Sequence, residues 1–180
     1  PAYDLIDMEA YRHSRFLYVN RSFMHKNSIS VITSRGCPYN CVFCSIKLHM
    51  GRKYRAHSPE YALKHLELLV NKYGFTSFHF EDDNISLNKK RFEAILDGII
   101  DKKFNIRWDT PNGIRADTLN RDILKKIKRS GCRQLTLAIE SGSQRVLDDV
   151  IRKQSSLEKV LDVVRMCKEE KIRATSFYVI

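Results

Sequence analysis

Short β-prone runs alternate with segments of helical period along the whole chain. The β-prone runs cover residues 29–34, 76–80, 106–110, 134–139 and 174–180. Four segments between them carry apolar residues at every third or fourth position, which predicts amphipathic helices. The spacing from strand to strand suits parallel βαβ units, which need about 30 residues each.

Residue types at the helix ends support these helices. Ser58 followed by Pro59 is typical of a helix start. Thr118 predicts the start of the third helix, and Ser155 with Glu158 forms a capping-box pattern before the fourth. The expected apolar face of that fourth helix consists of Leu157, Val160, Leu161, Val164 and Cys167.

The alternating pattern predicts an α/β fold. Right-handed crossovers would place the helices outside a sheet of about five parallel strands, either an open sheet or part of a barrel. The chain has 180 residues, whereas a complete eight-unit βα barrel needs about 250. Because it begins at Pro1 and ends in an apolar run at residues 176–180, we expect it to be part of a longer protein.

Polar residues that could carry chemistry follow the predicted strands. A group of cysteines follows the first strand, and Glu81 and Asp82 follow the second. Asn112 lies in a turn-like Pro-Asn-Gly triplet after the third strand, and Glu140 and Ser141 follow the fourth. Loops at the carboxyl ends of parallel strands carry the functional residues of such folds, so we expect a site at this edge.

Hydropathy and charge limit the classes of protein to which the chain could belong and the partners it could bind. From a mean hydropathy of −0.40 and the lack of a long apolar run, we expect neither a membrane span nor a secretory leader within these 180 residues. The net charge is +11, and residues 1–57 hold nine Lys and Arg but three Asp and Glu. The densest basic stretch consists of Lys47, His49, Arg52, Lys53, Arg55 and His57. It could bind nucleic acid or an anionic ligand, or it could be a solvated loop whose acidic partner lies elsewhere.

Five cysteines fall into two groups. Cys37, Cys41 and Cys44 lie within eight residues, while Cys132 and Cys167 have apolar neighbours and are expected in the core. The odd number and the clustering argue against a secreted disulfide framework and favour a reducing, cytoplasmic compartment.

The spacing C-x3-C-x2-C can surround one soft metal centre. A structural zinc ion would need a fourth ligand, for which His49, His57, Cys132 or Cys167 are candidates. A 4Fe–4S cluster normally takes four cysteines, so three thiolates would leave one iron open to a substrate or cofactor.

Residues 34–45, Ser-Arg-Gly-Cys-Pro-Tyr-Asn-Cys-Val-Phe-Cys-Ser, resemble the cluster loop of radical S-adenosylmethionine (radical SAM) enzymes. Residues 51–55, 80–84, 108–115 and 139–142 resemble the subgroup with a cobalamin-binding domain before the radical domain. The resemblance implies a partial (β/α)6 TIM-like barrel. Residues 1–27 would then be a linker after the cobalamin-binding domain, and residues 28–180 the radical SAM core, cut within the fifth strand.

The resemblance also implies cofactors and their contacts. Cys37, Cys41 and Cys44 would each bind one iron of a 4Fe–4S cluster, with S-adenosylmethionine (SAM) chelating the fourth. The implied SAM contacts are Phe43 near the adenine, Glu81 or Asp82 at the methionine ammonium, Glu140 and Ser141 at the ribose or amino-acid group, and Arg152, with Lys153 as the alternative, at the carboxylate. Asp109, Asn112 and Arg115 would line the substrate pocket or only shape the turn at Pro111.

The implied activity is reductive cleavage of SAM to a 5′-deoxyadenosyl radical, followed by methylation or rearrangement of an unactivated carbon in a small-molecule substrate. The electron would come from an external donor such as flavodoxin or ferredoxin. The basic surplus keeps an RNA-modifying radical SAM enzyme open, and the cysteine spacing keeps a zinc-stabilised nucleic-acid binding module open. Because the family segment that backs the adenine would follow residue 180, we expect the chain alone to hold cluster and SAM poorly.

Overall fold

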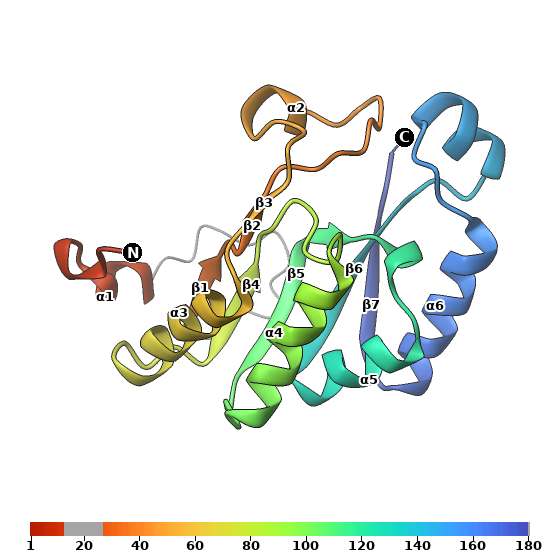
Figure 1. Cartoon of the computed structure of the whole chain (residues 1–180). Helices are drawn as coiled ribbons and strands as arrows, with labels where there is room; N and C mark the ends of the chain where they lie inside the picture. The colour runs from red at the N-terminus through yellow and green to blue at the C-terminus, as the bar shows by residue number, and fades with distance from the viewer. Residues whose placement is uncertain (13–26, 180) are drawn as a thin grey trace.

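One parallel five-stranded sheet forms the centre of the computed structural model, which describes residues 1–12 and 27–179. The strands follow one another in chain order: β1 (Ser28–Val31), β4 (Ser77–Phe80), β5 (Arg107–Ile114), β6 (Cys132–Glu140) and β7 (Arg173–Tyr178). Four helices lie along one face of this sheet (Figure 1): α3 (Pro59–Asn71), α4 (Lys89–Asp101), α5 (Arg121–Arg129) and α6 (Leu157–Glu169). The predicted α/β class with about five parallel strands and outer helices is confirmed; the described strands do not close into a barrel.

The core lies between the sheet and these helices. The rings of Phe80 and Trp108, from neighbouring strands, meet edge to face with 5.4 Å between their centres. The Trp108 indole donates a hydrogen bond of 3.1 Å to the Ser130 carbonyl, so its single polar atom is satisfied inside the core. Cys132 and Cys167 are both buried here, as predicted.

Two of the predicted helix starts are wrong by one to three residues. The hydroxyl of Ser58 caps α3 as expected, accepting the Tyr61 N–H at 3.2 Å. The third helix, α5, is capped by Asn120, because the chain first forms a 3-10 helix (Ala116–Thr118) that contains Thr118. The fourth helix, α6, is capped by Ser156, while Ser155 is buried.

The first predicted strand divides in two. β1 ends at Val31, and residues Ser34–Arg35 form a separate strand, β2, which pairs antiparallel with β3 (Arg55–Ala56). The chain leaves the sheet here because the Asp82 carboxylate, not a strand partner, accepts the Thr33 N–H. This small ladder and helix α2 (Ile46–His49) rise above the carboxyl ends of the large sheet (Figure 1).

The predicted turn after the third strand is wrong. β5 continues through residues 111–113 to Ile114, with a shift in register against β6 between Thr110 and Ile114. Gly113 has a φ of +93° within this irregular stretch, a backbone conformation that glycine adopts without strain. The Pro-Asn-Gly triplet therefore forms a bulge that bends the strand at its functional end.

The apolar face of the fourth helix also differs from the prediction. Val163 is fully buried against the sheet, whereas Leu161 and Val164 are 55% and 36% exposed. Both exposed residues line a hollow beside β7, together with Ala174 and Tyr178.

The first residues of the chain pack on α3. The Tyr3 hydroxyl lies 2.7 Å from His65 Nε2, and its ring meets Tyr73 edge to face. The predicted linker over residues 1–27 lies in part outside the described residues. No helix in the described segments is long and apolar enough to span a membrane.

Candidate functional site

The loop that carries Cys37, Cys41 and Cys44 stands above the carboxyl ends of the strands. All three side chains are half-buried free thiols. Gly36 starts the loop with a φ of +83°, and a Cβ on it would lie 2.3 Å from the carbonyl oxygen of Lys53. The next residue, Cys37, adds a hydrogen bond between the same two backbone segments, since its N–H donates to the Gly51 carbonyl at 3.4 Å. The loop thus depends on close packing of two backbone segments.

Gly36→Ala is expected to disrupt the loop, since left-handed backbone costs alanine about 1–2 kcal/mol and the Cβ would overlap the Lys53 carbonyl. Iron bound per chain after anaerobic reconstitution should fall severalfold. Two controls separate the causes: Gly51→Ala has a positive φ but open space, and Gly142→Ala has neither constraint. Equal iron in Gly36→Ala and Gly142→Ala would contradict the expectation.

The number of thiols in the cysteine loop matches a 4Fe–4S cluster with one open iron. Such a cluster takes one thiolate per iron, and the loop supplies three free thiols. In the described segments no three Cys, His, Asp or Glu side chains are gathered around one point as for a single metal ion. Burial raises the pKa of the Cys41 thiol, and the positive charges of Lys153 and Arg115 act in the opposite direction.

The acids after the second strand hold the cysteine loop. Asp82 is 2% exposed and accepts the Thr33 N–H at 3.1 Å, the Thr33 hydroxyl at 2.7 Å and the Ser34 hydroxyl at 2.5 Å. Asp83 accepts the Gly36 N–H at 2.7 Å. Glu81 accepts the Ser30 hydroxyl. In this structure Asp82 is committed to the loop, and Glu81 is the less engaged of the two predicted ammonium contacts.

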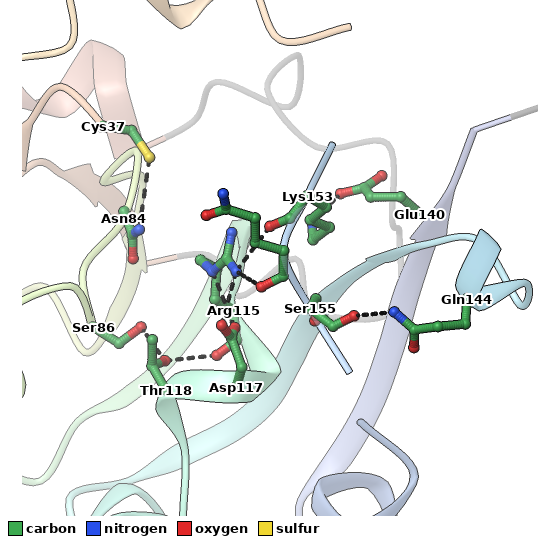
Figure 2. Close-up of polar contacts among 11 residues, drawn as sticks. Cys37, Asn84, Ser86, Arg115, Asp117, Thr118, Glu140, Gln144, Lys153 and Ser155 are labelled. Carbon is green, nitrogen blue, oxygen red and sulfur yellow. Dashed lines mark hydrogen bonds and ion pairs between the residues drawn. The ribbon is translucent and has the colours of Figure 1, made fainter. Parts of the chain in front are cut away.

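Asn84, which sequence reasoning did not assign, lies beside a cluster cysteine. Its side-chain N–H donates to Cys37 Sγ at 3.6 Å (Figure 2). The residue is 3% exposed, and its Oδ1 atom is buried with no hydrogen-bond partner among the described residues. A buried acceptor without a partner is costly, so this oxygen suits a bound group with an N–H or O–H donor. The only sequence signal was its place directly after the acidic run.

A buried ion pair joins the last residue of β6 to the segment that follows this strand. Lys153 Nζ lies 2.9 Å from Glu140 Oε1, and the two side chains are 5% and 8% exposed (Figure 2). Arg152, the first sequence candidate, is exposed, so the structure brings the alternative Lys153 to the site. Glu140 has a φ of +74°, and such strain in a non-glycine residue concentrates at functional sites. Ser141 lies next to it and accepts the Ser143 N–H.

Arg115 connects three parts of the site. Its guanidinium lies over the Tyr39 ring of the cysteine loop, 3.7 Å from the ring centre. It also donates to Asp117 at 2.8 and 3.0 Å and to the carbonyls of Lys153 and Gln154 at 3.1 Å each (Figure 2). The side chain is buried and heavily bonded, which fits a structural link between loops better than the predicted substrate contact.

The three predicted pocket residues are not brought together. Asp109 contacts His79 at 2.6 Å within the sheet, one layer below the strand ends. Asn112 is exposed at the rim and donates to the Glu81 carbonyl at 2.8 Å, and Arg115 lies under the cysteine loop. Phe43, the predicted adenine contact, is 49% exposed on the loop.

The sequence matches the radical SAM superfamily over residues 31–180. The chain belongs to this superfamily, which confirms the resemblance of the cysteine loop. Membership implies a 4Fe–4S cluster and SAM as cofactors.

Individual relatives are longer proteins. The chain is 34% identical over its full length to an uncharacterized methyltransferase of Pyrococcus horikoshii and covers 36% of that protein. It is 31% identical over 82% of its length to cytidylyl-2-hydroxyethylphosphonate methyltransferase of Streptomyces wedmorensis and covers 27% of it. The chain therefore spans about a third or less of these relatives.

A solved structure with the same fold is the radical SAM methyltransferase TsrM of Kitasatospora setae with cobalamin and a [4Fe-4S] cluster bound. The TM-score is 0.73 at 17% identity, over 83% of this chain and 30% of that one. The cobalamin-dependent radical enzyme OxsB gives a TM-score of 0.69 at 23% identity, over 84% of this chain and 24% of that one. At these identities the likeness establishes the fold.

Proposed function

We propose that residues 28–180 are the core of a radical SAM enzyme that holds a 4Fe–4S cluster through Cys37, Cys41 and Cys44. The observation that carries the proposal is the loop of three free, half-buried thiols at the carboxyl edge of a parallel sheet, within a superfamily match. When bound, the cluster would supply the electron that cleaves SAM into methionine and a 5′-deoxyadenosyl radical, which abstracts hydrogen from the substrate.

The structure supports a specific distribution of SAM contacts among these residues. Asn84 Oδ1, buried with no hydrogen-bond partner in the part of the chain that the structure describes, suits the methionine ammonium as an acceptor beside Cys37. Lys153 suits the methionine carboxylate, and Glu140 would hold the lysine amine in place. Phe43 offers an exposed ring for the adenine, and Ser141 lies next to Glu140 for a ribose contact. Glu81 and Arg152 remain the competing assignments for the ammonium and the carboxylate.

The relatives support methylation as the reaction and a small molecule as the substrate. One relative is a methyltransferase of cytidylyl-2-hydroxyethylphosphonate, and others are C-12(1)- and C-8(2)-methyltransferases of bacteriochlorophyllide d from Chlorobaculum tepidum. TsrM and OxsB, which share the fold, bind cobalamin. We infer a cobalamin-dependent methyl transfer in a cytoplasmic protein, with cobalamin held by a domain joined through residues 1–27 and with Asn112, at the exposed rim, near the substrate.

Single Cys→Ala variants at 37, 41 and 44, made in the full-length protein, are expected to lose most of the iron that the unaltered full-length protein takes up, about four irons per chain. Anaerobic reconstitution followed by iron, sulfide and visible-absorption measurements checks this. Cys167→Ala is the control, since burial raises the pKa of this core thiol to about 11 and removes it from metal binding. One tightly held zinc ion and no iron in the unaltered protein would overturn the proposed function.

A further inference from the structure

Three consecutive side chains after β4 bond the segment that leads into the cysteine loop. Asp82 and Asp83 accept hydrogen bonds from residues 33–36, in each case from a backbone N–H or a hydroxyl group. Asn84 comes next, and its amide donates to the sulfur of Cys37 at 3.6 Å (Figure 2). The side chain therefore changes from a carboxylate, which only accepts, to an amide, which can donate, at the position that faces a sulfur.

A bound iron would strengthen this contact. The sulfur of a free thiol is a weak acceptor, so the contact adds little to the stability of the metal-free fold. An iron-bound thiolate is an anionic acceptor, and hydrogen bonds to ionised acceptors are about twice as strong as those between neutral groups. A carboxylate in place of the Asn84 amide would repel the thiolate and offer no donor. The residue type therefore suits a sulfur that carries negative charge.

The Asn84 side chain is held in place away from water. The residue is 3% exposed and its neighbour Ile85 is buried in the core, while the hydroxyl of Ser86 lies 2.6 Å from that of Thr118. The amide carbonyl points away from Cys37 (Figure 2), so the N–H group faces the sulfur. The low dielectric of a buried place strengthens a hydrogen bond. Asn84 is therefore a fixed donor to one of the expected cluster ligands.

The three cysteines of the loop have different surroundings. In the part of the chain that the structure describes, Cys37 is the only one of them whose sulfur accepts a hydrogen bond from a side chain. Cys41 lies near the positive charges of Lys153 and Arg115, which oppose the effect of burial on the pKa of its thiol. Each of these two cations is paired with a carboxylate, at 2.9 and 2.8 Å. Changing Asn84 therefore alters the surroundings of one sulfur and leaves the charges of the site as they are.

We propose that Asn84 is a positioning residue that acts through the Cys37 sulfur and raises the reduction potential of the 4Fe–4S cluster, an inference that rests on the proposed function. Reduction adds one electron from an external one-electron reductant, and no covalent bond forms or breaks. Because the reduced cluster is more negative, the N–H group of Asn84 stabilises it more than it stabilises the oxidised cluster. Hydrogen bonds to the sulfurs are among the factors that set the potentials of such clusters. Without this donor, the same reductant would reduce a smaller fraction of the protein.

The test is Asn84→Leu in the full-length protein, reconstituted anaerobically and studied without SAM. Leucine keeps the branched shape of the side chain and has no donor. A redox titration followed by electron paramagnetic resonance measures the midpoint potential of the cluster. The equilibrium constant for one-electron reduction should be about tenfold lower than in the unaltered protein, which is a midpoint potential about 59 mV lower. Because SAM is absent, a contact between Asn84 Oδ1 and the SAM ammonium cannot contribute to this difference.

Two further variants separate the donor from the packing of the loop. Asn84→Ala also removes the donor but adds no bulk, so its midpoint potential should fall in the same direction, and it decides the question if Asn84→Leu holds no cluster. Ser86→Ala is the matched control, because it removes a buried polar contact of the same loop, to Thr118, and none to a sulfur. Its equilibrium constant for reduction should change less than twofold.

Three results would overturn the role of Asn84 and leave the proposed function standing. The first is a four-iron cluster with an unchanged midpoint potential in Asn84→Leu. The second is an equal fall in Ser86→Ala, and the third is loss of the cluster in both Asn84 variants, since the residue would then support assembly of the cluster. If the unaltered full-length protein assembles no 4Fe–4S cluster, the proposed function fails and this inference fails with it.

Discussion

Arg115→Ala is expected to lower the free energy of unfolding by about 3–5 kcal/mol, the usual cost of removing one partner from a buried charged network. Asp117 would lose both hydrogen bonds that it accepts from Arg115, and the carbonyls of Lys153 and Gln154 would lose a shared donor. The Tyr39 ring would lose the cation over its face. Urea denaturation of the metal-free protein, followed by circular dichroism, measures the change.

Two further variants define the cause. Arg115→Lys keeps the positive charge but not the planar fork that reaches Asp117 and two carbonyls together, so it should recover less than half of the loss. Arg129→Ala, at an exposed arginine of α5, should change stability by less than about 0.5 kcal/mol. A loss below 1 kcal/mol in Arg115→Ala, on the order of a surface substitution, would show that the network is not coupled.

The contacts of Arg115 illustrate which parts of this site could be predicted from the sequence and which could not. The three cysteines are predictable because they are close in sequence and their chemistry depends on residue type alone. The choice between Arg152 and Lys153 is not predictable from the sequence. It depends on the positive φ angles of Arg152 and Gln154, which set the directions in which successive side chains of this segment point. Arg115 bonds to the carbonyl groups there from 38 and 39 residues away. No local pattern contains that contact.

The few errors in the predicted helix and strand boundaries have a comparable cause. The five strands and the four helices between them follow from hydrophobic periodicity, which the local sequence records directly. The capping of α5 by Asn120 does not follow from periodicity. Thr118 and Asn120 are both good capping residues, and the choice between them depends on the 3-10 helix that contains Thr118. The bulge at residues 111–113 reads as a turn, since Pro and Gly disfavour regular strand; its continuation depends on pairing with β6.

The second large effect is expected at Asp82. Asp82→Ala should lower the free energy of unfolding by about 3–4 kcal/mol, because it leaves the Thr33 N–H and two hydroxyls in a buried site without their acceptor. Iron uptake should fall with it, since Ser34 and Thr33 lead directly into the cysteine loop. Thermal unfolding and iron content after reconstitution measure both effects. Asp122→Ala, at an exposed carboxylate of α5, is the control and should match the unaltered protein.

Comparing Asn84→Ala with Asp82→Ala decides which of the two residues supports the cysteine loop and which contacts the SAM ammonium. Asn84 makes one weak contact to Cys37, so its loss should cost stability little and leave most iron bound. If Asn84 Oδ1 accepts the SAM ammonium, the affinity of the reconstituted protein for SAM should fall about tenfold, the equivalent of a lost charge-assisted hydrogen bond of about 1.5 kcal/mol. If Asp82 contacts the ammonium instead, the pattern reverses: Asp82→Ala would remain stable and iron-loaded but bind SAM weakly. Equilibrium SAM binding, measured beside unfolding for both variants, separates support of the loop from contact with the cofactor.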